Sequence, residues 1–157
     1  MSKWRLDNDS LRELAAIGKA DGILRAQSVV EHARDSASAL HRHFTWDDTE
    51  AAGEYRLEEA RRLIRCAVVL LPSVDVEYRA FVSLMSDRVL PGGGYRVMTD
   101  VLTDDARREE MLLQALQHLE RLRQRYMELT ELAPVFAALD NVERRNVKRR
   151  ALRAAGA

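Results

Sequence analysis

Hydrophobic residues recur at helical spacing through the first 65 positions and predict three helices. Asp9 or Ser10 is expected to cap the first helix, which runs to Ile17. Gly22 tolerates positive φ and marks a turn, and the second helix is predicted over residues 24–34. The third is predicted to be capped within residues 45–48 and to end near residue 65. Its expected buried stripe consists of Ala51, Ala52, Tyr55, Ala60, Leu63 and Ile64.

The pattern changes after residue 65 and becomes typical of short strands. Residues 66–71 form an apolar run rich in β-branched side chains, and Pro72 ends it. Residues 78–84 and 95–98 predict two more strands, and the three consecutive glycines at 92–94 provide a turn between them. We therefore expect a small antiparallel sheet within residues 66–100.

A heptad pattern over residues 104–140 predicts a long helix. One core position holds Leu112, Leu119, Tyr126 and Ala133, and the other holds Ala115, Leu122, Leu129 and Phe136. Pro134 either kinks this helix or begins a new one at its first turn, because proline cannot donate a backbone hydrogen bond. The apolar stripe can pack on the sheet, on another helix of the chain or on a second copy, and the pattern leaves all three open.

Together these elements predict an α+β fold that is mainly α. We expect one domain over residues 1–140, made of a helical unit (9–65), a small sheet (66–100) and a long helix (104–140), followed by a basic arm (141–157). The 157 residues are 46% hydrophobic, which is enough for a real core. No apolar run reaches the roughly 20 residues that span a bilayer, and the first residues lack a signal-peptide core, so a cytoplasmic location is expected. The single cysteine, Cys66, excludes an intramolecular disulfide and is predicted to be buried and inert.

The net charge of zero conceals an uneven distribution along the chain. Residues 1–60 carry 8 basic and 12 acidic side chains, whereas residues 141–157 carry 6 basic and one acidic. A dense basic segment of this kind is typical of a site for a polyanion. A solvated, helix-prone tail is the alternative interpretation.

Three features favour nucleic-acid binding: the short N-terminal helices with a glycine turn, an arginine series on the third helix, and the basic arm. Arginine binds phosphate through two donors at once. In the third helix, however, Glu50, Glu54, Glu58 and Glu59 are spaced to pair with the same arginines. The predicted contact residues are Arg61, Arg62, Arg65, Arg144, Arg145, Lys148, Arg149 and Arg150.

Support for catalysis is weak. Metal-ligating residue types gather only at His41, His43, Asp47, Asp48, Glu50 and Glu54, without the spacing of a known metal motif. No nucleophile motif occurs, and the glycines at 92–94 lack the Lys-Ser/Thr of a phosphate-binding loop. We therefore predict a non-catalytic protein with no metal or cofactor, and keep a metal-dependent nuclease as a remote alternative.

The sequence resembles uncharacterised proteins encoded by tailed phages and prophages. The resemblance is carried by Ala39-Leu40-His41-x-x-Phe44-x-Trp46-Asp47-Asp48, then Ala51-Ala52 and Tyr55-Arg56, and later by Gly93-Gly94-Tyr95-Arg96. It implies a viral or prophage origin, the cytosol of an infected host, and a role near DNA metabolism, packaging or regulation. It assigns no catalytic residue. Read physically, Leu40, Phe44 and Trp46 are expected to anchor a loop on the helical core.

The leading functional hypothesis is thus an accessory protein that binds DNA without catalysis, as a homodimer. The alternative is a protein–protein adaptor or assembly component. Its partner or dimer face would be Leu112, Leu119, Leu122, Tyr126 and Leu129.

Overall fold

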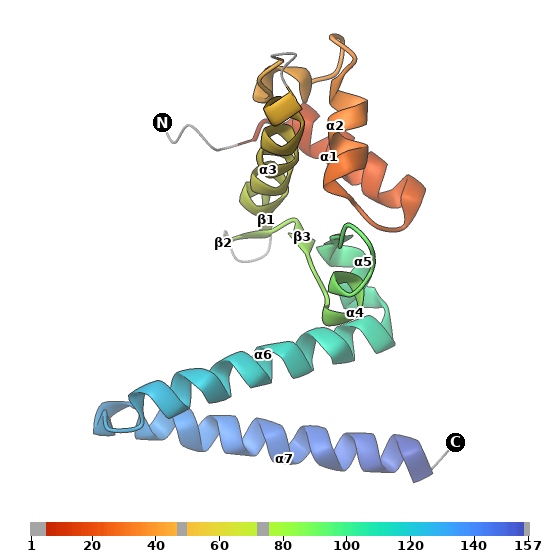
Figure 1. Cartoon of the computed structure of the whole chain (residues 1–157). Helices are drawn as coiled ribbons and strands as arrows, with labels where there is room; N and C mark the ends of the chain where they lie inside the picture. The colour runs from red at the N-terminus through yellow and green to blue at the C-terminus, as the bar shows by residue number, and fades with distance from the viewer. Residues whose placement is uncertain (1–5, 47–49, 72–75, 156–157) are drawn as a thin grey trace. The chain divides into compact units, whose positions relative to one another are not determined.

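The computed structural model describes residues 6–46, 50–71 and 76–155, and it confirms a mainly helical α+β fold (Figure 1). The chain divides into two compact units, Met1–Arg108 and Glu109–Ala157. The boundary therefore lies near the start of the predicted long helix and not at the basic segment. None of the described helices is both long and apolar enough to cross a membrane.

The first helix, α1 (Asn8–Asp21), is capped one residue earlier than its start, by Asp7. The Asp7 carboxylate accepts hydrogen bonds from the backbone N–H of Asp9 (3.1 Å) and of Ser10 (3.0 Å). The expected caps, Asp9 and Ser10, are thus the first-turn residues that donate to the real one. The helix runs to Asp21, four residues beyond the predicted end at Ile17, and Gly22 then has the expected positive φ, 69°.

The helical core lies between α1, α2 (Ala26–Ala33), the short 3-10 helix η1 (His41–His43) and α3 (Glu50–Cys66). Leu14, Leu24, Leu40 and Ile64 are fully buried at its centre. Phe44 is buried and Trp46 packs against the same cluster, so the expected anchoring of this loop is confirmed. The predicted caps Asp47 and Asp48 lie outside the described residues. The Thr45 hydroxyl donates to Glu59 (3.2 Å), well inside α3.

Two antiparallel strand pairs confirm the small sheet but divide it. Strand β1 (Val68–Leu71) pairs with β2 (Val76–Arg79), and β3 (Phe81–Val82) pairs with β4 (Arg96–Val97). The predicted strands 66–71 and 78–84 are therefore shorter or broken. Cys66 is the last residue of α3 and is half-buried, not a strand residue in the core. Two short helices, α4 (Met85–Arg88) and α5 (Met98–Thr103), flank β4.

The Gly94-Tyr95-Arg96 segment attaches β4 to the end of α1. A Cβ on Gly94 would clash with the Ile23 side chain, so any other residue there would displace Ile23. Backbone hydrogen bonds join Tyr95 to Leu24 in both directions (2.7 and 2.9 Å). Arg96 donates to both oxygens of the Asp87 carboxylate (2.6–3.0 Å) and to the carbonyl of Gly22 (3.0 Å).

The structure confirms a long C-terminal helix, but two helices occupy the region predicted as one helix over residues 104–140, because the first ends early and the chain folds back. Helix α6 spans Asp105–Tyr126, a 3-10 turn η2 covers Thr130–Leu132, and α7 spans Ala133–Ala155. Pro134 lies in the first turn of α7, where a missing N–H costs nothing. Of the two outcomes open for Pro134, the new helix is the one observed.

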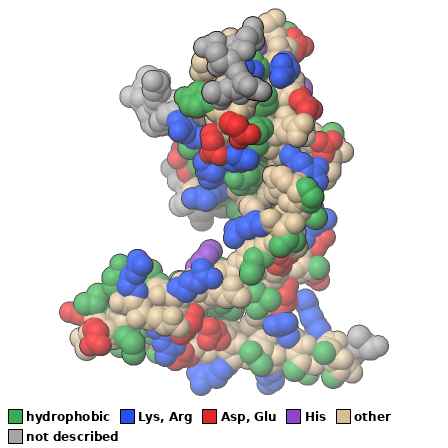
Figure 2. All heavy atoms as spheres, in the orientation of Figure 1, with side chains coloured by type: hydrophobic (Ala, Val, Ile, Leu, Met, Phe, Trp, Pro, Cys, Tyr) green, Lys and Arg blue, Asp and Glu red, His purple; other side chains and the backbone are tan. Residues whose placement is uncertain are grey.

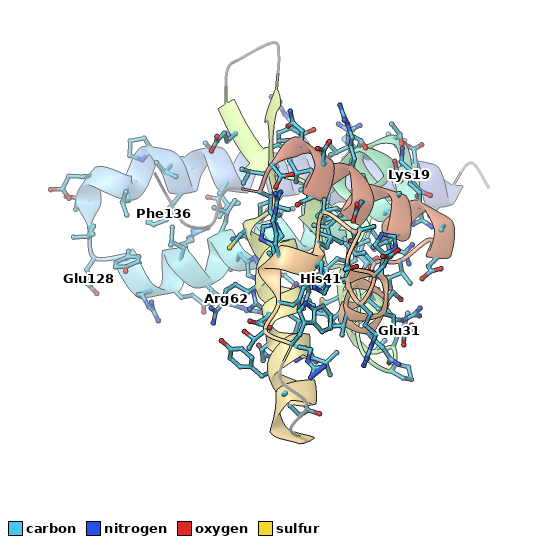
Figure 3. All side chains as sticks on the ribbon, turned by 90° about the horizontal axis from the view of Figure 1, so that it is seen from above. Lys19, Glu31, His41, Arg62, Glu128 and Phe136 are labelled. Carbon is cyan, nitrogen blue, oxygen red and sulfur yellow. The ribbon has the colours of Figure 1, made fainter. Side chains whose placement is uncertain are left out.

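The α6–α7 hairpin contains few buried side chains. Leu116 and Leu139 are its buried apolar residues among those described, and Gln114 and Asn146 are its buried polar ones. An ion pair between Arg123 and Asp140 (2.6 Å) links the helices near the turn. Asp140 thereby raises the pKa of Arg123. The Arg123 guanidinium also lies 5.9 Å from the ring centre of Phe136 on α7. Figure 3 labels Phe136.

Candidate nucleic-acid interface

The basic segment predicted as a separate arm is the C-terminal half of α7. Its six cations occur between residues 144 and 153 without an intervening acid, and all six are exposed. Blue side chains accordingly line α7 in Figure 2. Because a helix turns by about 100° per residue, these side chains point in different directions and divide into two groups.

The first group, Arg144, Arg145 and Lys148, lies on the outer side of α7. The spacing i, i+1, i+4 places the three side chains along one side of a helix. Arg144 donates to the neutral amide of Asn141. In the part of the chain that the structure describes, no carboxylate lies within ion-pair distance of any of the three. Their positive charge is therefore exposed to solvent.

The second group, Arg149, Arg150 and Arg153, surrounds Glu109 at the start of the hairpin. The distances from their guanidinium nitrogens to the Glu109 carboxylate are 3.7, 3.7 and 3.3 Å. Arg149 also donates to the buried Asn146 amide (2.8 Å). One carboxylate thus faces three guanidinium groups.

The arginine series on α3 is less available than its sequence suggests. Arg61 forms an ion pair with Glu58, as the spacing of the glutamates allowed. Arg62 and Arg65 are exposed, at the end of α3 that leads into β1. The structure therefore places Arg61, Arg62 and Arg65 in one compact unit and the α7 cations in the other.

On α3, Tyr55 is exposed and the neighbouring Arg56 is buried. Tyr55 was predicted in the buried stripe of α3, but its side chain is 53% exposed, whereas Arg56 is only 7% exposed. The Arg56 guanidinium lies 5.4 Å from the Trp46 ring centre, a cation–π contact. Arg56 is therefore unavailable to a polyanion.

The predicted partner face on α6 is mostly uncovered. Leu112 is half-buried, while Leu119, Leu122, Tyr126 and Leu129 are between 39% and 49% exposed. The residues that face α7 instead include Leu116, which the heptad places outside its two core positions. The side of α6 that carries the heptad leucines is thus different from the side that packs against α7, which we call the seam of the hairpin.

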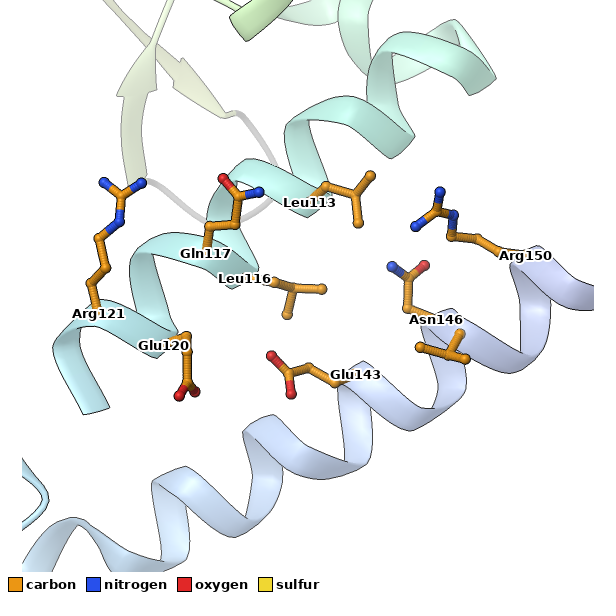
Figure 4. Close-up of a pocket in the computed structure, with 9 residues that line it drawn as sticks. Leu113, Leu116, Gln117, Glu120, Arg121, Glu143, Asn146 and Arg150 are labelled. Atoms are coloured by element: carbon orange, nitrogen blue, oxygen red, sulfur yellow. The ribbon is translucent and has the colours of Figure 1, made fainter. Parts of the chain in front are cut away.

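A cleft of about 420 Å³ follows one side of the hairpin seam (Figure 4). Leu116 from α6 and Glu143 and Asn146 from α7 project into it. Gln117, Arg121 and Val147 also line it. The mixture of acids and bases around the cleft does not favour an anion there.

The histidines of the candidate metal cluster make structural contacts. His41 stacks on Trp46 with ring centres 4.9 Å apart, and its Nδ1 lies 2.8 Å from the carbonyl oxygen of Ala33. His43 Nε2 is 3.1 Å from the Ser10 hydroxyl. Burial and the nearby Arg42 lower the pKa of His43, so the ring is neutral at pH 7. Asp47 and Asp48 lie outside the described residues, among which no group of three potential ligands could hold a metal ion.

Ser10, His43 and Asp7 are the residue types of a hydrolase triad, but their geometry is different. The Asp7 carboxylate is 3.9 Å from His43 Nε2, the same nitrogen that faces Ser10. In a triad the acid contacts Nδ1 and the serine is accessible, whereas Ser10 is fully buried. This cluster holds the start of α1 against η1.

Comparisons with protein-family models, curated proteins and solved structures found no match to this chain.

Proposed function

We propose that this chain is a non-catalytic accessory protein of phage or prophage type that binds DNA through the basic side of α7. Arg144, Arg145 and Lys148 contact the phosphates directly. Arg149 and Arg150 stand beside them, held by Glu109, and add to the attractive potential. The observation that carries the proposal is the group of three exposed cations with no carboxylate partner among the described residues.

The residue types agree with phosphate binding. Guanidinium groups bind phosphate through two parallel hydrogen bonds and are weakly hydrated, so they lose little on contact. Five of the six cations between residues 144 and 153 are arginines. The α3 arginines lie in the other compact unit and carry no part of this argument.

Salt dependence of DNA binding tests the proposal quantitatively. Each phosphate contact contributes about −0.9 to the slope of log K against log salt, so three contacts give a slope near −2.7. Fluorescence anisotropy with a labelled DNA duplex measures this slope. In Arg145→Gln/Lys148→Gln, we expect weaker binding and a slope smaller in magnitude by about 2.

A matched control separates a local site from the effect of total charge. Lys19→Gln/Arg34→Gln removes one lysine and one arginine from exposed positions on α1 and at the end of α2. This variant should bind like the original protein. If both variants weaken DNA binding equally, the effect comes from the net charge of the chain and not from a local site on α7. If no complex forms with duplex or single-stranded DNA at low salt, the proposal is refuted.

A further inference from the structure

The α6–α7 hairpin buries too little apolar surface to account for its own stability. Only Leu116 and Leu139 are buried among its described large apolar residues. Structures below roughly 70–80 residues rarely obtain enough stability from a single small core, and helical ones often gain it by association. Six other large side chains of the hairpin form an exposed apolar face: Leu119, Leu122, Tyr126, Leu129, Val135 and Val142.

This apolar face lies opposite the cleft. Tyr126 lies nine positions after Gln117 of the cleft lining, which at about 3.6 residues per turn puts them on opposite sides of α6. On α7, Val142 lies five positions before Val147 of the cleft lining, a rotation of about 140°. Because the two helices are antiparallel, both rotations lead to the same side of the hairpin. Figure 2 shows hydrophobic side chains gathered where α6 meets α7.

We propose that the apolar face binds the same face of a second copy of this chain, forming a four-helix bundle around a two-fold axis. On each helix the face contains one seven-residue step, Leu119 to Tyr126 on α6 and Val135 to Val142 on α7. This shared spacing lets two copies interdigitate over the half of the hairpin next to the turn, as a self-complementary interface requires.

The exposed area fits a dimer. The six side chains are between 39% and 53% exposed. Together they expose on the order of 500 Å² per copy, a large part of the roughly 800 Å² that each partner contributes to a stable interface. Met127, at the hairpin turn and 67% exposed, extends the same apolar region.

Two isomeric double variants test this interface. Leu122→Gln/Val142→Gln changes the apolar face. Leu152→Gln/Val147→Gln makes the same chemical change at positions that are more exposed (65% and 67%) but lie outside it. Neither variant alters a charge, so the DNA contacts proposed above are untouched. Sedimentation equilibrium at about 0.5 M salt, where charge interactions are strongly screened, measures self-association of the full chain.

We expect the original chain to dimerise reversibly and the control variant to match it. The face variant should dissociate at least about tenfold more readily. Circular dichroism checks that each variant is helical, and if the face variant does not fold, sedimentation of the original chain decides alone. If the original chain is monomeric at every concentration, the proposal is overturned. The apolar face would then be open to a different protein and not to a second copy of this chain. Equal weakening by both variants overturns the proposal as well.

Discussion

Asp7 combines two contacts at the beginning of α1. Its carboxylate caps the helix and also forms an ion pair with Arg42, and it lies 3.9 Å from Nε2 of the neutral His43. Partial burial acts to raise the pKa of Asp7, but hydrogen bonds from the Ser10 backbone and hydroxyl and the charge of Arg42 outweigh it and lower the pKa to about 2. The carboxylate therefore binds its proton less readily in the folded chain than in the unfolded one.

The stability contributed by Asp7 should depend on pH. Because the pKa is lower in the folded state, this contribution is complete above about pH 4 and is lost as the pH falls towards 2. Asp7→Ala should therefore cost about 1 kcal/mol at pH 7, the usual value of an N-cap, and progressively less below pH 4. Urea unfolding at several pH values measures the difference.

Asp9→Ala is the control for this prediction. Asp9 is also acidic and lies in the first turn of α1, but it forms only an exposed ion pair with Arg12 (3.1 Å). Such pairs contribute about 0.2–1 kcal/mol. A cost of Asp7→Ala that is the same at pH 2 and pH 7 would show that the charge of its carboxylate is not what stabilises the helix.

At the scale of elements, the Asp87–Arg96 ion pair joins three parts of the fold. Asp87 is the third residue of α4, Arg96 begins β4, and Arg96 also binds the carbonyl at the end of α1. The Asp87 side chain is 1% exposed and that of Arg96 is 20% exposed. A buried carboxylate of this kind is tolerated only while its partner is present.

Arg96→Met should destabilise the fold by about 3–5 kcal/mol, because it leaves the Asp87 charge buried without a partner. Adding Asp87→Asn should recover part of this loss by removing that charge. Arg88→Met is the matched control, since Arg88 is exposed and should change stability by no more than about 0.5 kcal/mol. Urea unfolding of the original chain, Arg96→Met, Asp87→Asn and the double variant gives the coupling energy, and additive effects would contradict the assignment.

At the scale of the whole molecule, the N-terminal unit contains a complete core. Its buried cluster runs from Leu6 to Phe81, entirely within residues 1–108. The hairpin unit has only two buried large apolar side chains among its described residues. The two units should therefore differ greatly in how well they fold alone.

A chain ending at Arg108 should keep a cooperative thermal transition and near-ultraviolet circular dichroism from its packed aromatic residues. Residues 109–157 alone should be weakly helical at low concentration and gain helix as concentration rises, if the apolar face self-associates. Circular dichroism over a dilution series measures both. A truncated chain without a cooperative transition would show that the core of residues 6–81 is insufficient.

The sequence by itself determined those features that depend on neighbouring residues. Helical spacing located α1, α2 and α3, Gly22 located the turn after α1, and the run of six cations located the charge on α7. Each signal lies within a few positions of its effect, because capping, turn geometry and helical periodicity are local. The alternation around β3 and β4 likewise predicted antiparallel strands, although not their division into two pairs.

Only the tertiary structure decided which side chains met partners distant in the sequence. Glu109 faces arginines about forty residues later, and no local pattern connects them. Arg56 occupies a core position because Trp46 offers its ring there, while Tyr55 is turned outward. The heptad continues past Tyr126, yet the chain turns back there and pairs Arg123 with Asp140. Periodicity fixes which residues share a face, whereas the packing of separate elements fixes what that face meets.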